Sequence, residues 1–327
     1  MLAASRPNFG TIFRIRDDRQ AKALTGCTVA MLHELLPVFE QLFKERPRTK
    51  RPLDSMTQAL SRTRAYGGGR TGVLATIEDK LVFVLLYLKA YPTYDVLSAI
   101  FNLDRGPACR RVQQLLPVLE ATLGRKIVLP ARKITSIEEF YQKFPEAKDV
   151  LVDGTERPIQ KPKDQKKRKK VYSGKKKTTA RKHIVLVNPK KRILVLGKSK
   201  TGRRHDKRIA EKQQHLEHLP DDVTAWMDSG FVGAQTIHPN SQICFRATKN
   251  HPLTESQKQH NRIVSTFRIP VEHAIGGMKR MKAAADIWRG KIGGLDDQVM
   301  LLSAGLWNFY LQATEQDHLN RQLQATG

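Results

Sequence analysis

Hydrophobic positions in the first 130 residues recur at helical spacing. One set predicts a helix whose first turn is capped by Thr28. A dense apolar run at 81–88, flanked by charged residues, predicts a buried helix that stops at Pro92. Residues 1–23 lack such a pattern, so we expect a loosely held arm before a helical domain at 24–130.

Within the helical domain, two helices joined by a tight turn are predicted at about 93–122. The first places Val96, Leu97 and Ile100 inward. This is the layout of a helix-turn-helix, whose second helix enters the DNA major groove, although an ordinary helical hairpin gives the same pattern. In the helix-turn-helix interpretation, the polar side chains that face DNA from the second helix are Arg110, Arg111 and Gln114.

The pattern changes after residue 130, where short apolar runs alternate with helical segments. The first run ends at Asp153, because Gly154 and Pro158 break the strand pattern. Later runs predict strands at 183–188, 192–196, 223–228 and 242–248, with helices at 136–144 and 205–218, an interrupted helix near Pro270, and a last helix to about Leu311. We therefore expect an α/β domain with a mixed sheet at 131–311 and a frayed polar tail at 312–327.

Two acids, Asp153 and Asp228, are predicted at the ends of buried strands, and Glu272 lies one turn into the helix that Pro270 begins. Adjacent strands would bring the two aspartates to one edge of the sheet. Three carboxylates from separate segments could hold two Mg²⁺ ions, which prefer oxygen ligands. Lys279 shares a helix face with Glu272 and could contact a phosphate. Turn caps and surface ion pairs are the alternative interpretation of these residues.

Charge favours a polyanionic partner. The chain has 58 Lys and Arg against 31 Asp and Glu, a formal charge of +27, which is typical of proteins that bind nucleic acid. The basic segment, residues 157–182, holds thirteen Lys and Arg and one acid. It is either a solvated loop or a strap that follows DNA phosphates. The strap residues would be Lys166, Lys167, Arg168, Lys169, Lys170, Lys175, Lys176 and Lys177.

Other classes of protein fit the sequence poorly. The apolar run at 81–88 is too short to span a bilayer, and the N-terminus has no signal-peptide core. Three scattered cysteines argue against a disulfide framework and suit a reducing cytoplasm. We expect a cytoplasmic protein without a membrane partner.

The chain contains several longer motifs, each occurring once. They are Val152-Asp153-Gly154-Thr155-Glu156-Arg157-Pro158-Ile159, Tyr172-Ser173-Gly174-Lys175-Lys176-Lys177, His205-Asp206, Asp228-Ser229-Gly230-Phe231, the stretch from Val271 to Arg280, and, nearer the N-terminus, Gly67-Gly68-Gly69-Arg70, Glu78-Asp79-Lys80-Leu81 and Tyr91-Pro92-Thr93. Together they cover about residues 20–311, and they resemble the transposases of bacterial insertion sequences in the insertion sequence 5 group.

The resemblance implies a ribonuclease-H-like catalytic domain with a DDE triad of Asp153, Asp228 and Glu272. The family's Arg-x3-Glu-x6-Lys signature maps onto Arg268, Glu272 and Lys279. The tyrosine of that signature is Ser265 here, and Pro270 stands between the arginine and the glutamate.

The resemblance also implies the chemistry. Two Mg²⁺ or Mn²⁺ ions per active site would let the enzyme cut the ends of its element and join the freed 3′-hydroxyls to target DNA. The implied partners are the terminal inverted repeats, target duplex DNA and a second copy of the chain, in a homodimer or larger complex at the bacterial nucleoid. A non-catalytic repressor and an endonuclease without strand transfer are the competing functions.

Overall fold

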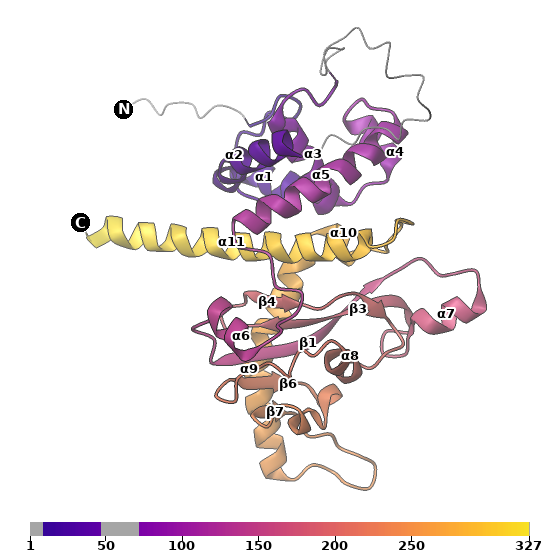
Figure 1. The fold of residues 1–327 in the computed structure, drawn as a ribbon, viewed down its shortest axis with the longest axis vertical. Helices are drawn as coiled ribbons and strands as arrows, with labels where there is room; N and C mark the ends of the chain where they lie inside the picture. Colours follow the sequence, from indigo (N-terminus) through magenta and orange to yellow (C-terminus); the bar gives the residue numbers. More distant parts are fainter. Residues whose placement is uncertain (1–8, 47–71, 327) are drawn as a thin grey trace. The chain divides into compact units, whose positions relative to one another are not determined.

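The computed structural model describes residues 9–46 and 72–326, which divide into two compact units (Figure 1). The first comprises residues 9–46, 72–87 and 92–125, and the second comprises residues 88–91 and 126–326. The motif at 67–70 and most of the predicted connector lie outside the described residues. In these described ranges, no helix is both long and apolar enough to cross a membrane.

The first unit is all-helical, as predicted. Its helices are α1 (Asp18–Thr25), α2 (Val29–Glu45), α3 (Ile77–Ala90, whose last turn belongs to the second unit), α4 (Tyr94–Ile100) and α5 (Arg105–Arg125). The Thr28 hydroxyl caps α2 by accepting a hydrogen bond from the Met31 N–H at 3.1 Å. Helices α4 and α5, with the turn between them, form the predicted helix-turn-helix.

The N-terminal arm was expected to be loose over residues 1–23. Its described part, residues 9–23, is packed instead. Phe9 and Ile15 are buried, and α1 begins at Asp18. The buried Asp79 carboxylate accepts hydrogen bonds from the backbone N–H groups of Thr11 and Ile12 at 2.9 and 3.1 Å. A distant acid therefore holds this segment, and the local hydrophobic pattern gives no sign of it.

The inward face predicted for α4 is narrower than expected. Leu97 is fully buried, but Val96 and Ile100 are 51% and 42% exposed. Helix α4 has only seven residues, so only a narrow stripe of its surface packs against α5. On α5, the apolar residues Val112, Leu115 and Leu116 are all buried.

The second unit is built around a mixed seven-stranded sheet in which β4, β3, β1, β6 and β7 lie in that spatial order, with β2 and β5 also paired to β3. Strand β3 is antiparallel to β1, whereas β6 is parallel to β1 and to β7. The strands are β1 (Asp149–Pro158), β2 (Tyr172–Ser173), β3 (Thr178–Val187), β4 (Ile193–Leu196), β5 (Lys200–Thr201), β6 (Thr224–Met227) and β7 (Ser241–Ile243). The helices are α6 (Ile137–Lys143), α7 (Gln165–Val171), α8 (Asp206–Lys212), α9 (Glu255–Met278), α10 (Lys282–Ala285) and α11 (Leu295–Thr326).

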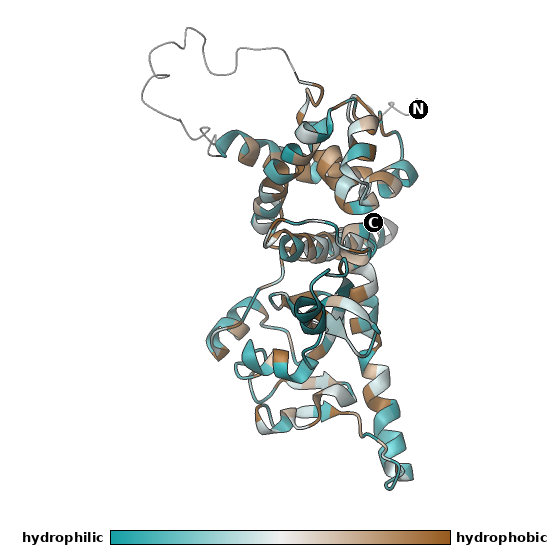
Figure 2. Cartoon of the chain, turned by 90° about the vertical axis from the view of Figure 1, so that its right-hand side faces the viewer, coloured by the Kyte–Doolittle hydropathy of each residue, from teal (hydrophilic) through white to brown (hydrophobic). Residues whose placement is uncertain are grey.

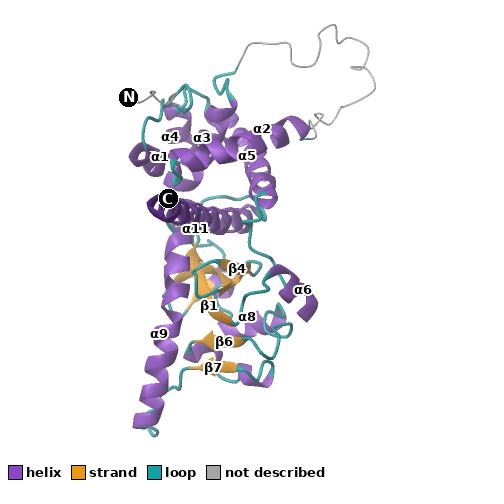
Figure 3. Cartoon of the chain, turned by 90° about the vertical axis from the view of Figure 1, so that its left-hand side faces the viewer, coloured by secondary structure: helices purple, strands orange, loops and turns teal. Residues whose placement is uncertain are grey.

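Helices cover both faces of this sheet. Figure 3 shows α9 on one side and α6 and α8 on the other. One buried cluster joins Val150 and Val152 of β1 to Phe140 of α6 and Ile209 of α8. The other joins Leu151, on the opposite face of β1, to α9 and α11. Alternate residues of β1 thus point into different cores, which explains the unbroken apolar run that predicted this strand.

Strand β1 continues past its predicted end at Asp153 and runs to Pro158. An ideal Cβ on Gly154 would stand 2.7 Å from the Asp206 carboxylate carbon, so glycine is needed there to make room for a side chain. Pro158 is the last residue of the strand, where proline is tolerated. Asp153 therefore lies in mid-strand rather than at a strand end.

Helix α9 is also longer than predicted, because it passes through Pro270 without interruption. The proline deprives the Thr266 carbonyl of its helical N–H partner. Val264 and Val271, on either side of Pro270, are both fully buried, and this packing offsets the loss. The first turns of α9 are coloured hydrophilic in Figure 2 and extend beyond β7 (Figure 3).

Three further boundaries differ from the predictions. Strand β7 ends at Ile243, because the N–H and carbonyl of Phe245 bond to the Asn261 side chain of α9 at 2.7 and 3.0 Å. Helix α8 ends at Lys212, close to Gln214 with its positive φ of 55°. Helix α11 continues through the polar tail to Thr326, since Gln, Glu, Leu and Ala have high helix propensity.

Candidate active site

Two aspartates lie side by side at the centre of the sheet, Asp153 within β1 and Asp228 directly after the end of β6. Val152 of β1 pairs with Met227 of β6 in parallel register. The residues that follow this pair, Asp153 and Asp228, are therefore neighbours. Glu272 comes from α9, which packs against β1 and β6. All three acids line one cavity of about 700 Å³. The structure thus brings together the carboxylates that the sequence singled out.

Asp153 is the most enclosed of these acids. Its Oδ1 accepts the Gly154 N–H at 2.7 Å, and its Oδ2 forms an ion pair with the Arg268 guanidinium at 3.1 Å. Burial raises the pKa of Asp153, the Arg268 charge opposes that rise, and Asp228 adds to it. The carboxylate is therefore held in a site where its negative charge is only partly compensated.

The other two acids are more accessible. Asp228 accepts the Gly230 N–H at 2.9 Å, and Lys175 lies 4.0 Å from its second oxygen. Glu272 is exposed on α9. Within residues 9–46 and 72–326, no three His, Cys, Asp or Glu side chains converge closely enough to hold one metal ion. The three acids line one cavity, but the cation in contact with Asp153 is the Arg268 guanidinium.

The two basic residues of the motif on α9 reach the same cavity. Lys279 donates to the Glu156 carbonyl at 3.1 Å, and burial together with the charge of Lys176 lowers its pKa. The Arg268 Nε is buried and has no hydrogen-bond partner among the described residues. Both side chains are therefore placed to donate to an anion that enters the cavity.

A buried ion-pair cluster beside the acids was not predicted. Lys182 of β3 is nearly fully buried and lies 3.3 Å from Glu156 of β1 and 3.0 Å from Asp206 of α8. The Ser173 hydroxyl also donates to Glu156 at 2.9 Å. A signal was present, because Lys182 directly precedes the strand predicted at 183–188. The partners could not be read from the pattern, since they come from other elements.

One interpretation of the basic segment was a solvated loop, but part of it is helical. Lys166–Lys170 lies on α7, which Asp164 caps and whose side chains are not buried. Arg168 and Lys169 line a second cavity, and Lys175 lines both cavities. Lys176 lines the acidic cavity, and Lys177 forms the turn before β3 with a φ of 51°. Of the basic side chains proposed for the strap, Lys175 and Lys176 therefore reach the acidic cavity.

The residues predicted to face DNA in the first unit lie on α5. Arg110 and Gln114 are exposed, and half-buried Arg111 donates to the Gln114 side chain at 3.2 Å. All three lie within the first three turns of the helix, where recognition helices carry their base contacts.

Comparison with known families matches both units. Residues 73–125 match the helix-turn-helix of DDE superfamily endonucleases, and residues 152–308 match the DDE superfamily endonuclease domain itself. The chain belongs to the DDE endonuclease superfamily. As a DDE endonuclease, it has the predicted architecture: an all-helical helix-turn-helix region followed by a ribonuclease-H-like catalytic sheet.

One curated relative of this DDE endonuclease is described as a probable transposase for insertion sequence element IS702, from Microchaete diplosiphon. It is 29% identical over 236 residues, covering 72% of this chain and 81% of the relative. No solved structure matches the chain significantly. The finer assignment to the insertion sequence 5 group remains a prediction.

Replacing Arg110 and Arg111 with Ala tests the role of α5 in this DDE endonuclease. If either arginine reads bases, affinity for the element's ends should fall by about 1–3 kcal/mol per lost contact, with little change on random DNA. Filter binding on both DNAs measures this. A matched control replaces Arg16 and Arg19, two exposed arginines of the same unit. Equal losses on both DNAs would indicate phosphate contacts, and unchanged affinity would contradict a DNA-binding role for α5.

Proposed function

We propose that this chain is a DNA transposase that cuts the ends of an insertion sequence and joins them to target DNA. The observation that carries the proposal is the acidic cavity of Asp153, Asp228 and Glu272, bordered by Arg268 and Lys279. The family match and the relationship to a probable transposase support it. The charge of +27 supports a polyanionic substrate.

The residues fit a divalent metal by the chemistry of their donors. Carboxylate oxygens are the ligands that Mg²⁺ and Mn²⁺ prefer, and Asp153, Asp228 and Glu272 would hold the ions. Glu156 also lines this cavity, and its Oε2 is buried without a hydrogen-bond partner among the described residues. Bound divalent ions would supply an activated water and stabilise the leaving oxygen of a phosphodiester.

The chain's own basic groups would hold the DNA strand. When a phosphate enters the cavity, Arg268 Nε gains the acceptor that it lacks, and Lys279 gains an anionic partner that favours its protonated form. Lys175 and Lys176 border the same opening. This arrangement positions a phosphodiester against the carboxylates without a covalent enzyme intermediate.

The deciding experiment uses DNA taken from the flanks of the gene, which carries the element's ends if the proposal is right. Full-length chain with Mg²⁺ should nick both ends and should join a supplied pre-cut end to target DNA. A repressor would bind these ends equally well without metal and never nick them. An endonuclease would nick but yield no joined product. Either outcome would contradict the transposase proposal.

We expect α7 to follow the DNA backbone beside the site. Changing its lysines to Gln should lower the slope of log affinity against log salt by about 0.9 per lost phosphate contact and slow cleavage. Thermal stability should hold, because these side chains are exposed. Arg168 is kept, because it donates to the Pro162 carbonyl at 3.1 Å. The replaced residues are Lys166, Lys167, Lys169 and Lys170.

A control variant removes the same charge from exposed positions of the second unit that lie outside α7 and line neither the acidic cavity nor the second cavity. Its substituted residues are Lys198, Lys212, Lys249 and Lys291. If both variants alter the salt slope equally, only net charge matters, and α7 is a solubilising feature rather than a DNA contact.

A further inference from the structure

A second cavity of about 1000 Å³ adjoins the acidic one and shares Lys175, Asp206 and Asp228 with it. Its walls come from segments far apart in the sequence: the end of α7 with β2 and the turn that follows, Lys182 of β3, the loop between β5 and α8, and the turn after β6. Whatever occupies this cavity therefore lies next to a catalytic acid.

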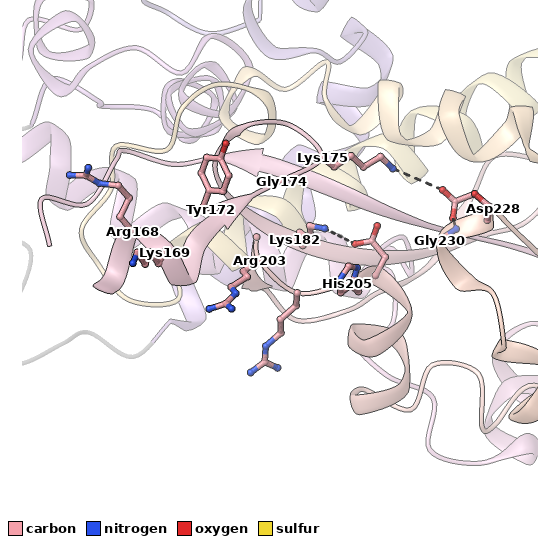
Figure 4. Close-up of a pocket in the computed structure, with 14 residues that line it drawn as sticks. Arg168, Lys169, Tyr172, Gly174, Lys175, Lys182, Arg203, His205, Asp228 and Gly230 are labelled. Carbon is pink, nitrogen blue, oxygen red and sulfur yellow. Dashed lines mark hydrogen bonds and ion pairs between the residues drawn. The ribbon is translucent and has the colours of Figure 1, made fainter. Parts of the chain in front are cut away.

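The charge of this cavity is uneven. Figure 4 shows Arg168, Lys169 and Arg203 toward one end and Asp228 at the other. Arg204 also lines the cavity. The cations supply more positive charge than Asp206 and Asp228 can balance, so the cavity attracts an anion that extends away from the acids.

An aromatic side chain stands among these cations. Tyr172 lines the cavity and is 45% exposed. Its backbone is fixed, because it pairs with Thr179 in the β2–β3 hairpin and its neighbour Ser173 is bonded to Glu156. A half-exposed ring on a fixed backbone within a basic cavity offers a flat apolar surface that a phosphate-binding site alone does not need.

We propose that this cavity binds an unpaired stretch of DNA strand that continues from the cut phosphate, with one base stacked on Tyr172. This inference rests on the proposed DNA-cleaving function of the adjoining site. Cations that track phosphates, together with an aromatic platform for bases, are the features that bind single strands. Paired bases are stacked on one another and present only their edges in the grooves, whereas an unpaired base has a free face. The volume also suits a few nucleotides rather than a duplex.

The test compares binding to a blunt duplex with binding to the same duplex carrying a five-nucleotide unpaired end, made once in each polarity, in the absence of divalent metal. Tyr172→Ala should weaken binding of the DNA with the unpaired end by roughly 5- to 150-fold, the range expected for one lost stacked base. Binding of the blunt duplex should not change. Tyr172→Phe keeps the ring and should bind both DNAs as the wild type does.

Two further variants guard against trivial explanations. Tyr172→Leu keeps apolar bulk without a ring, so it should lose the preference for unpaired ends while melting at the wild-type temperature. Tyr141→Ala removes a comparably exposed tyrosine from α6, outside the cavity, and should change nothing on either DNA.

Equal loss on both DNAs, or no loss on either, would overturn the inference even if the enzyme cuts and joins DNA normally. The reverse outcome is distinguishable. A Tyr172-dependent preference for unpaired ends in a protein that never cleaves DNA would overturn the proposed function and leave the single-strand site standing.

Discussion

Replacing Asp153 with Asn is expected to abolish DNA cleavage while leaving DNA binding nearly unchanged. The substitution removes the negative charge of one carboxylate that lines the acidic cavity but alters the shape of the side chain very little. Changes even to outer partners of metal sites cost about 10- to 100-fold, so the loss here should exceed about 100-fold. A gel assay of strand nicking in Mg²⁺ measures it.

The control for this variant is Asp149→Asn. Asp149 begins the same strand, accepts a hydrogen bond from the Trp226 indole N–H at 2.8 Å, and is not part of the cavity lining. An Asn oxygen can accept the same bond, so this variant should cleave at the wild-type rate. Cleavage by Asp153→Asn at the rate of Asp149→Asn would contradict the triad assignment.

The Asp153→Asn variant should not lose stability. Burial raises the pKa of Asp153 above its unfolded value, so the folded state favours the protonated form. Above that raised pKa, the buried negative charge of Asp153 destabilises the folded state, and this destabilisation disappears as the pH falls through the raised pKa. Asn carries no charge at any pH. The melting temperature of Asp153→Asn should therefore equal or exceed that of the wild type at neutral pH, and the difference should shrink in acid. Melting curves across pH measure this.

The helical domain, the mixed sheet and the neighbouring aspartates could be predicted from the sequence, because each depends on a local pattern. The run at 150–152 is apolar because its alternate residues enter two cores, and that signal is strong in any single sequence. The strand end was misplaced because Gly154 is usually a breaker. Here glycine makes room for Asp206, a residue fifty-two positions later, and no local rule contains that contact.

The remaining errors have the same origin. Pro270 normally ends a helix, but buried Val264 and Val271 hold α9 together on both sides of it. Residues 9–15 lack helical periodicity, yet the Asp79 carboxylate fixes them. In each case a tertiary contact overrides a local preference. The ion pair between Arg268 and Asp153, 115 positions apart, belongs to the same class.

The contact most costly to break is expected to be that of Lys182. Its ammonium lies between the Glu156 and Asp206 carboxylates in a site almost closed to solvent, and the three residues join β1, β3 and α8. Lys182→Met should remove the cation and leave two buried acids uncompensated. Such a loss destabilises by about 3–5 kcal/mol. For a unit of this size, the melting temperature should fall by roughly 6–20 °C.

The comparison is Lys258→Met, which removes an exposed ion pair with Glu255 on α9 and should cost no more than about 1 kcal/mol. Adding Glu156→Gln or Asp206→Asn to Lys182→Met should recover part of the loss, because each removes one stranded charge. That recovery separates an electrostatic role from simple side-chain packing, which a further substitution would not restore. If Lys182→Met melts at the same temperature as Lys258→Met and the second substitution restores nothing, then this cluster does not hold β1, β3 and α8 together.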